Sequence, residues 1–72
     1  MPEMHPVESS VIEAIGYDPD RRELHIRFVD TGLYVYLDVD RATFDRLCAA
    51  ASKGSHFNRA VKPRGFAFER RP

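Results

Sequence analysis

The stretch "ELHIRFVDTGLYVYLDV", residues 23–39, decides the fold class. In its first part Leu24, Ile26 and Phe28 alternate with polar residues, which is the period of a strand with one buried face. The central "DTG" predicts a short turn, in which Gly32 is free to adopt a positive φ. The segment "LYVYLDV" then returns as a second strand, so these residues predict an antiparallel hairpin.

The returning strand is apolar on both faces, because leucine and valine alternate there with Tyr34 and Tyr36. If the aliphatic residues face a helix, the two tyrosines stand on the open face of the sheet near His25 and Arg27. They would then form an aromatic and cationic platform on which bases can stack. In the alternative the tyrosines belong to the core. The alternation alone leaves both arrangements open.

Downstream of the hairpin the apolar period becomes helical, with Asp40 placed as the N-cap. Gly54 stands where a left-handed residue would end this helix, and Ser55 where a serine could cap a further short turn, "HFNRAV". Cys48 lies on the apolar stripe and is therefore expected to be buried and unreactive. The predicted stripe consists of Phe44, Leu47, Cys48 and Ala51.

Upstream of the hairpin, "VIEAIGYD" predicts another strand. Ile12 and Ile15 are three residues apart, so they share a face only if a bulge near Ala14 restores the alternation. Residues 1–8 contain two prolines and are predicted to be a flexible leader. At the other end of the chain "FAFERR" predicts a last strand with Phe66 and Phe68 on one side.

Together these elements predict an α+β fold: a small antiparallel sheet of three to four strands, one amphipathic helix packed on one face, and a short helical turn after it. With 72 residues there is room for one domain, which we assign to residues 9–70.

Composition argues against several classes of protein. The single cysteine excludes an intramolecular disulfide, and the N-terminus resembles no secretory signal, so we expect a cytoplasmic protein without a membrane span. His5, His25 and His56 are scattered, and no nucleophile stands beside a base. We therefore expect no catalysis, no metal, no cofactor and no small-molecule substrate.

The neutral net charge hides an asymmetry. Ten acidic and five basic residues precede Lys53, whereas six basic residues and Glu69 alone follow from Lys53 onward. A chain of this kind can attract a polyanion with one end. Basic residues interleaved with hydroxyls, glycine and an aromatic ring predict an RNA or anion site made of Lys53, Gly54, Ser55, His56, Arg59, Lys62 and Arg64.

Three separated strings, "SSVIEAIGYD", "GLYVY" and "ASKGSHFNRAV", resemble the KTSC domain family. This family is named for its occurrence at the C-terminus of some lysyl-tRNA synthetases and also occurs as stand-alone small bacterial proteins. The resemblance runs from about Val7 to Arg70, with the YxY and SKGxxFN strings as its marks. Val39-Asp40 replaces a common Val-Pro, and Phe66 and Phe68 replace frequent tyrosines.

The resemblance implies RNA binding only through the link with the synthetases. We accordingly expect an RNA-binding accessory domain, for a tRNA-like or another RNA, with Lys53, Arg59, Lys62 and Arg64 on phosphates. Tyr34, Tyr36 or His56 would lie near the bases. The alternative is a protein-interaction or homodimerisation module. It is favoured if the acidic N-terminal part of one copy faces the basic C-terminal part of another.

Overall fold

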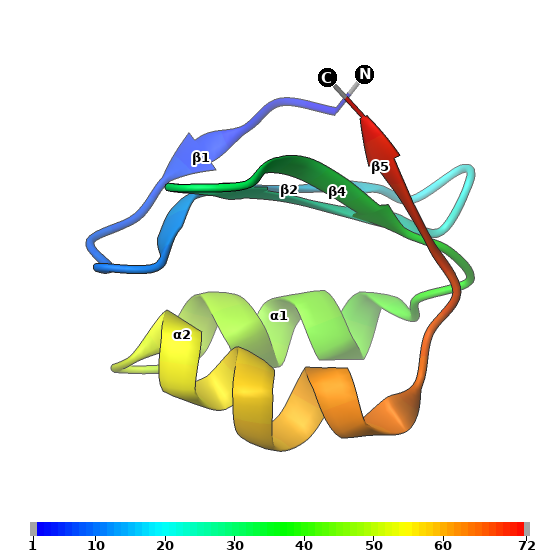
Figure 1. Cartoon of the computed structure of the whole chain (residues 1–72). Helices are drawn as coiled ribbons and strands as arrows, with labels where there is room; N and C mark the ends of the chain where they lie inside the picture. Colours follow the sequence, from blue (N-terminus) through cyan, green and yellow to red (C-terminus); the bar gives the residue numbers. More distant parts are fainter. Residues whose placement is uncertain (1, 72) are drawn as a thin grey trace.

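The computed structural model describes residues 2–71 and contains an antiparallel sheet in the order β1-β2-β3-β4-β5 (Figure 1). The α+β class is confirmed, but the described sheet has five strands instead of three to four. Their bounds are β1 His5–Pro6, β2 Ile12–Asp18, β3 Glu23–Phe28, β4 Gly32–Tyr36 and β5 Phe68–Arg71.

The strand without a sequence signature is β1, because two residues are too few to display a period. His5 pairs with Ile15, and Pro6 pairs with Ala14. This strand lies inside the segment 1–8 that was predicted as a leader, of which Met1 falls outside the described residues. The expected bulge in β2 is confirmed, since the register with β3 shifts between Ile12 and Ala14.

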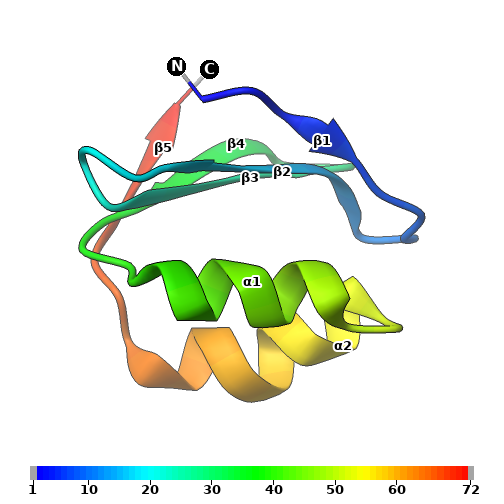
Figure 2. The same ribbon diagram turned by 180° about the vertical axis from the view of Figure 1, so that it is seen from behind.

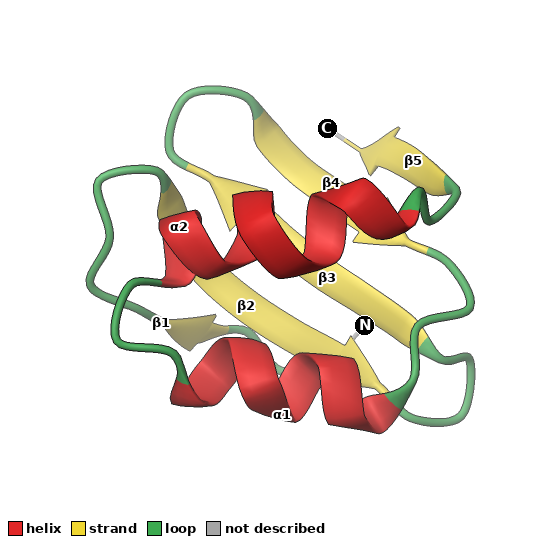
Figure 3. Ribbon diagram, turned by 90° about the horizontal axis from the view of Figure 1, so that it is seen from below, coloured by secondary structure: helices red, strands yellow, loops and turns green. Residues whose placement is uncertain are grey.

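The helical layer covers one face of the sheet with two rods that lie side by side and run in opposite directions (Figures 1 and 3). The first is α1, Arg41–Ala49. The second runs without a break through α2 (Lys53–His56), a wider π-type turn (Phe57–Val61) and a 3₁₀ turn (Lys62–Arg64); we call residues 53–64 the second helical segment. This segment is longer than the predicted short turn. Ser52 caps it in place of Ser55, and Gly65 ends it.

Helix α1 begins as predicted and ends earlier. The Asp40 side chain accepts from the backbone N–H of Thr43, which confirms the N-cap. The helix stops at Ala49, and its buried residues are Thr43 and Leu47. The expectation for Cys48 was wrong, since that side chain is exposed. Because only the Thr43–Leu47 side of α1 meets the sheet, position 48 turns outward, and Ala51 lies beyond the helix and is exposed.

The assignment of Gly54 as a left-handed stop was also wrong. Gly54 is a buried helical residue, and a Cβ there would stand 3.6 Å from Ser9 Oγ and from Val11. The glycines with positive φ are Gly32, as predicted, and Gly65, whose N–H donates to the carbonyl of Lys62 at the end of the second helical segment. The left-handed glycine therefore ends the second helical segment and not α1, because Ser52 caps a new helix shortly after α1 stops.

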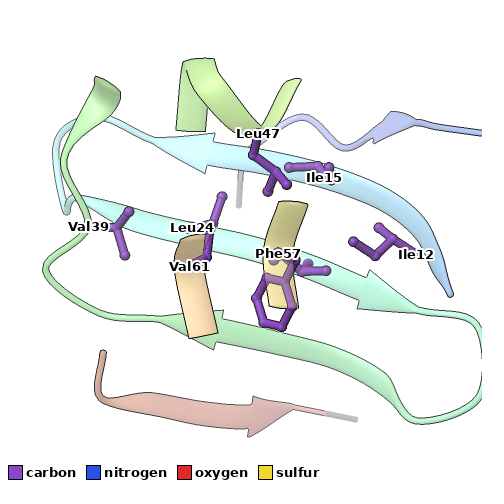
Figure 4. Packing of buried hydrophobic residues seen from close by; sticks show 8 residues of the cluster. Ile12, Ile15, Leu24, Val39, Leu47, Phe57 and Val61 are labelled. Atoms are coloured by element: carbon purple, nitrogen blue, oxygen red, sulfur yellow. The ribbon is translucent and has the colours of Figure 1, made fainter. Parts of the chain in front are cut away.

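The core lies between the sheet and both rods (Figure 4). Register places Tyr36 opposite Leu24 and Tyr34 opposite Ile26, so both tyrosines are on the helical side of the sheet. They are half-buried and do not form a platform with His25 and Arg27 on the open face, which corrects that alternative. The fully enclosed cluster is Ile12, Ile15, Leu24, Ile26, Val39, Leu47, Phe57 and Val61.

The opposite face of the sheet is closed as well. Leu33 and Val35 are buried there together with His25, which is 1% exposed. The N-terminal segment crosses this face, seen above the sheet in Figure 2. It runs so close to β2 that a Cβ on Gly16 would lie 2.7 Å from the backbone oxygen of Glu3 and 2.8 Å from Met4 Sδ. Gly16 thus permits a close backbone approach.

Candidate nucleic-acid interface

An aromatic groove opens on the helical side of the sheet, beyond the end of the closed core. Its volume is about 370 Å³. Three walls form it: strand β4, the second helical segment and the chain that enters β5. The residues that these walls contribute to the argument are Tyr34 and Tyr36, then Phe57, Asn58 and Lys62, then Phe66 and Phe68. We call this hollow the aromatic groove.

The rings in the groove form a continuous surface. Tyr36 pairs with Phe68 across β4 and β5. The Phe68 ring centroid lies 5.5 Å from those of both tyrosines, which are 6.4 Å from each other with nearly parallel planes. Phe68 is 55% exposed, so one face of this surface stays accessible. Such π-faces accept any flat aromatic ligand, and base stacking on them is tolerant of sequence.

Hydroxyl groups give the groove polar functions. Burial, followed by the neighbouring Tyr34, raises the pKa of Tyr36. At neutral pH its phenol is therefore protonated and can donate a hydrogen bond. The amide of Asn58 on the helical wall supplies both a donor and an acceptor.

Positive charge stands at two sides of the groove. Lys62 lines it and has no acidic partner among the described residues. The Arg70 guanidinium lies 5.8 Å from the centroid of Tyr34 and donates to the carbonyl of Thr31. Among residues 2–71, no acidic side chain lines the groove. Its chemistry therefore suits a flat ring attached to an anion.

A second hollow, of about 530 Å³, lies between the C-terminal end of α1 and the start of the second helical segment. Its polar lining comes from Arg46, Ser52, Ser55, His56 and Arg59. Neither arginine has an acidic partner within the described chain. Asp45, the acidic residue next to Arg46 in sequence, pairs with Arg41 instead. We call this second hollow the basic hollow.

The residues predicted as one anion site are divided among several surfaces. Lys53, Gly54 and Ser55 border a small hollow that Glu8 also lines. Ser55, His56 and Arg59 line the basic hollow, whereas Lys62 lines the aromatic groove. The basic hollow and the aromatic groove flank the second helical segment. Gly54 is buried in the segment itself.

Two of the predicted cations have structural partners. The Lys53 ammonium donates to the carbonyl of Ala50, 2.7 Å away, and so satisfies the end of α1. Arg64 donates to Thr43 Oγ1 at 2.6 Å and stands 3.5 Å from Asp40 Oδ1, with its guanidinium over the Phe66 ring. Arg64 therefore ties the end of the second helical segment to the cap of α1.

The backbone donors after Lys53 are also occupied. The N–H of Ser55 donates to Ser52 Oγ, and the N–H of His56 to the carbonyl of Ser52. These two backbone N–H groups are therefore not free to bind an anion. Side chains supply any anion binding that occurs here.

Sequence reasoning missed Arg46, Asn58, Arg70 and the pairing of the rings. The signal for the rings was present, because "YVY" and "FAF" share the two-residue spacing of one strand face. Arg46 had no comparable signal, because it lies in α1, outside the basic segment that begins at Lys53.

Among residues 2–71, no group of three His, Cys, Asp or Glu side chains is arranged to hold a metal ion. The same residues include no helix with the length and apolarity to cross a membrane.

Known proteins resemble this chain over most of its length. The KTSC domain family profile matches residues 8–66. A protein from Tsukamurella paurometabola is 51% identical over 61 residues, which cover 85% of this chain and 91% of that protein. The lysine–tRNA ligase of Nostoc punctiforme is 37% identical over 62 residues, 86% of this chain but 11% of the ligase.

A solved structure is also similar. The crystal structure of a KTSC domain protein from Yersinia pestis superimposes with a TM-score of 0.94 at 38% identity and covers all of both chains. The five-stranded sheet with its helical layer is therefore shared with that protein.

Proposed function

This chain belongs to the KTSC domain family, and we propose that it is a small non-catalytic accessory module that binds single-stranded RNA in the aromatic groove. The observation that carries the proposal is the accessible surface of Tyr34, Tyr36 and Phe68, bordered by the free cation Lys62. The match to part of a lysine–tRNA ligase also supports the proposal of RNA binding.

The proposed mode is one or two unstacked bases against the rings, with the adjoining phosphate near Lys62. Single-strand binders combine stacking aromatics with cations in this manner, and stacking contributes about 1–3 kcal/mol per base. The Tyr36 hydroxyl and the Asn58 amide lie in the same groove and can bond to base edges.

The first test removes a stacking ring without disturbing the core. Phe68→Ala should weaken binding of a fluorescein-labelled single-stranded RNA about 5- to 150-fold in fluorescence anisotropy. Val29→Ala is the matched control, because Val29 is 50% exposed and does not line the groove. Wild-type protein that binds no RNA at low salt would refute the proposal.

A second test removes charge. Lys62→Ala should weaken the binding of all RNA sequences alike. It should also lower the magnitude of the slope of log affinity against log salt concentration by about 0.7, the value for one phosphate contact on a single strand. Arg21→Ala serves as control, since Arg21 is exposed on the β2–β3 turn and lines neither hollow. Equal salt slopes for both variants would show that Lys62 does not contact an RNA phosphate.

Protein interaction is the second candidate function, and one observation favours it: Phe68 is exposed on β5, an edge strand of the sheet. Edge strands and exposed apolar rings are common docking elements. Size-exclusion chromatography distinguishes the two candidates. A dimer that dissociates on Phe68→Ala, together with no RNA binding, would support this second function and sink the first.

A further inference from the structure

We propose that the basic hollow is a phosphate subsite for the RNA strand whose base occupies the aromatic groove. This inference rests on the proposed function and extends it to a second surface. It assigns roles to Arg46, which no sequence signal marked, and to Arg59.

The charges of the basic hollow are uncommitted. Five of the nine arginines in the described chain have carboxylate partners within 4.0 Å, whereas Arg46 and Arg59, like Arg21 and Arg70, do not. In the part of the chain that the structure describes, no acidic side chain lines the hollow. Lys53 adds a third positive charge at the rim, since its ammonium is bound to the carbonyl of Ala50, which itself lines the hollow. A group placed here meets a field of one sign.

The donors fit the geometry of phosphate. Two guanidinium groups offer paired N–H donors, which match phosphate oxygens in a bidentate manner. The hydroxyls of Ser52 and Ser55 and the half-buried His56 ring add shorter donors from the same side of the second helical segment. A carboxylate would use fewer of these groups, because it has two oxygens.

Position connects the hollow with the groove. Ser55 and Arg59 are four residues apart and share one side of the second helical segment, whereas Asn58 and Lys62 share the side that faces the groove. One rod therefore separates a surface for bases from a surface for phosphates. A strand that places a base on the rings and continues over this rod brings a later phosphate to Arg59 and Arg46. Figure 3 shows the rod, labelled α2 at its start, beside α1.

The experiment has two arms. In the first, ¹H–¹⁵N spectra of the wild-type protein are recorded with inorganic phosphate and with chloride at matched ionic strength. Phosphate should shift the amide signals around Ser52, Ser55 and His56, and the Arg46→Ala/Arg59→Ala double variant should lose this response. If phosphate causes no localised change beyond that of chloride, the subsite is refuted.

The second arm measures RNA affinity against salt concentration. The double variant should lower the magnitude of the slope by about 1.4, the sum for two contacts on a single strand, while Arg21→Ala leaves it unchanged. If the wild type binds RNA and the double variant keeps the full slope, the RNA strand does not reach the hollow. If no RNA binds, the proposed function fails. The comparison of phosphate with chloride then tests independently whether the basic hollow binds phosphate.

Discussion

The two faces of the sheet are closed in different ways. Helices cover one face, and there the rings of β4 and β5 extend past the rods and leave the aromatic groove. The chain's own N-terminal segment covers the other face, where Gly16 lets the backbone of Glu3 approach closely. Large aromatic side chains on the first face leave a surface for a ligand, whereas on the second face Leu33, Val35 and His25 are buried. The free arginines of the basic hollow also belong to the helical side.

The largest loss of stability is expected from a substitution in the core on the helical side of the sheet. Leu24→Ala should destabilise the protein by about 2–5 kcal/mol, because Leu24 is fully buried beneath both rods. Urea denaturation followed by circular dichroism measures the change. A loss below 1 kcal/mol would mean that this face is less tightly packed than the face closed by the N-terminal segment.

The other face depends on Gly16. Gly16→Ala should cost about 1–3 kcal/mol, because the new methyl group collides with the backbone oxygen of Glu3, which cannot move without displacing the segment. The same denaturation experiment gives the value, and hydrogen exchange should show reduced protection at Ile15 and Val7, which bond or pair with this region. Met4→Ala relieves only the side-chain collision and should rescue little.

Two glycines on the helical side should respond in opposite directions. Gly65 has φ 70°, so Gly65→Ala should destabilise by about 1 kcal/mol. Gly54 is helical and a methyl group there meets its neighbours at ordinary distances, so Gly54→Ala should be neutral or stabilise by up to about 1 kcal/mol. Thermal unfolding of both variants measures the contrast. A clear destabilisation by Gly54→Ala would contradict the helical assignment.

The smallest effect is a dependence on pH at the cap of α1. The Thr43 hydroxyl, 2.6 Å from Asp40 Oδ1, lowers the pKa of Asp40, and Arg64 lowers it further. A carboxyl whose pKa is lower in the folded state stabilises the fold above its unfolded pKa, and this contribution disappears as the pH falls through the folded value. Asp40→Asn retains the cap but not the charge. Its difference from the wild type in urea midpoint should be constant between pH 5 and 8 and shrink below about pH 4.

Local patterns in the sequence predicted the parts of the fold that local chemistry determines. The alternation of Leu24 and Ile26, the cap at Asp40 and the turn at Gly32 all appear as expected. Cys48 was misplaced because an amphipathic stripe shows a helix's apolar side but not how much of it meets the sheet. The aromatic groove was not predicted for a related reason. The groove depends on the pairing of Tyr36 with Phe68, which lie more than thirty residues apart in the chain.

Strand β5 follows β4 in the sheet but is separated from it in sequence by the whole helical layer. The β2–β3–β4 meander closes only short loops, so its contacts can form early, whereas β5 must wait until the intervening chain has been placed. As a short edge strand it is also suited to local opening. We therefore expect the groove wall that holds Phe66 and Phe68 to form last and to open first. A ligand bound against these rings would hold β5 in its place in the sheet, so that ligand binding and the ordering of β5 would be thermodynamically linked.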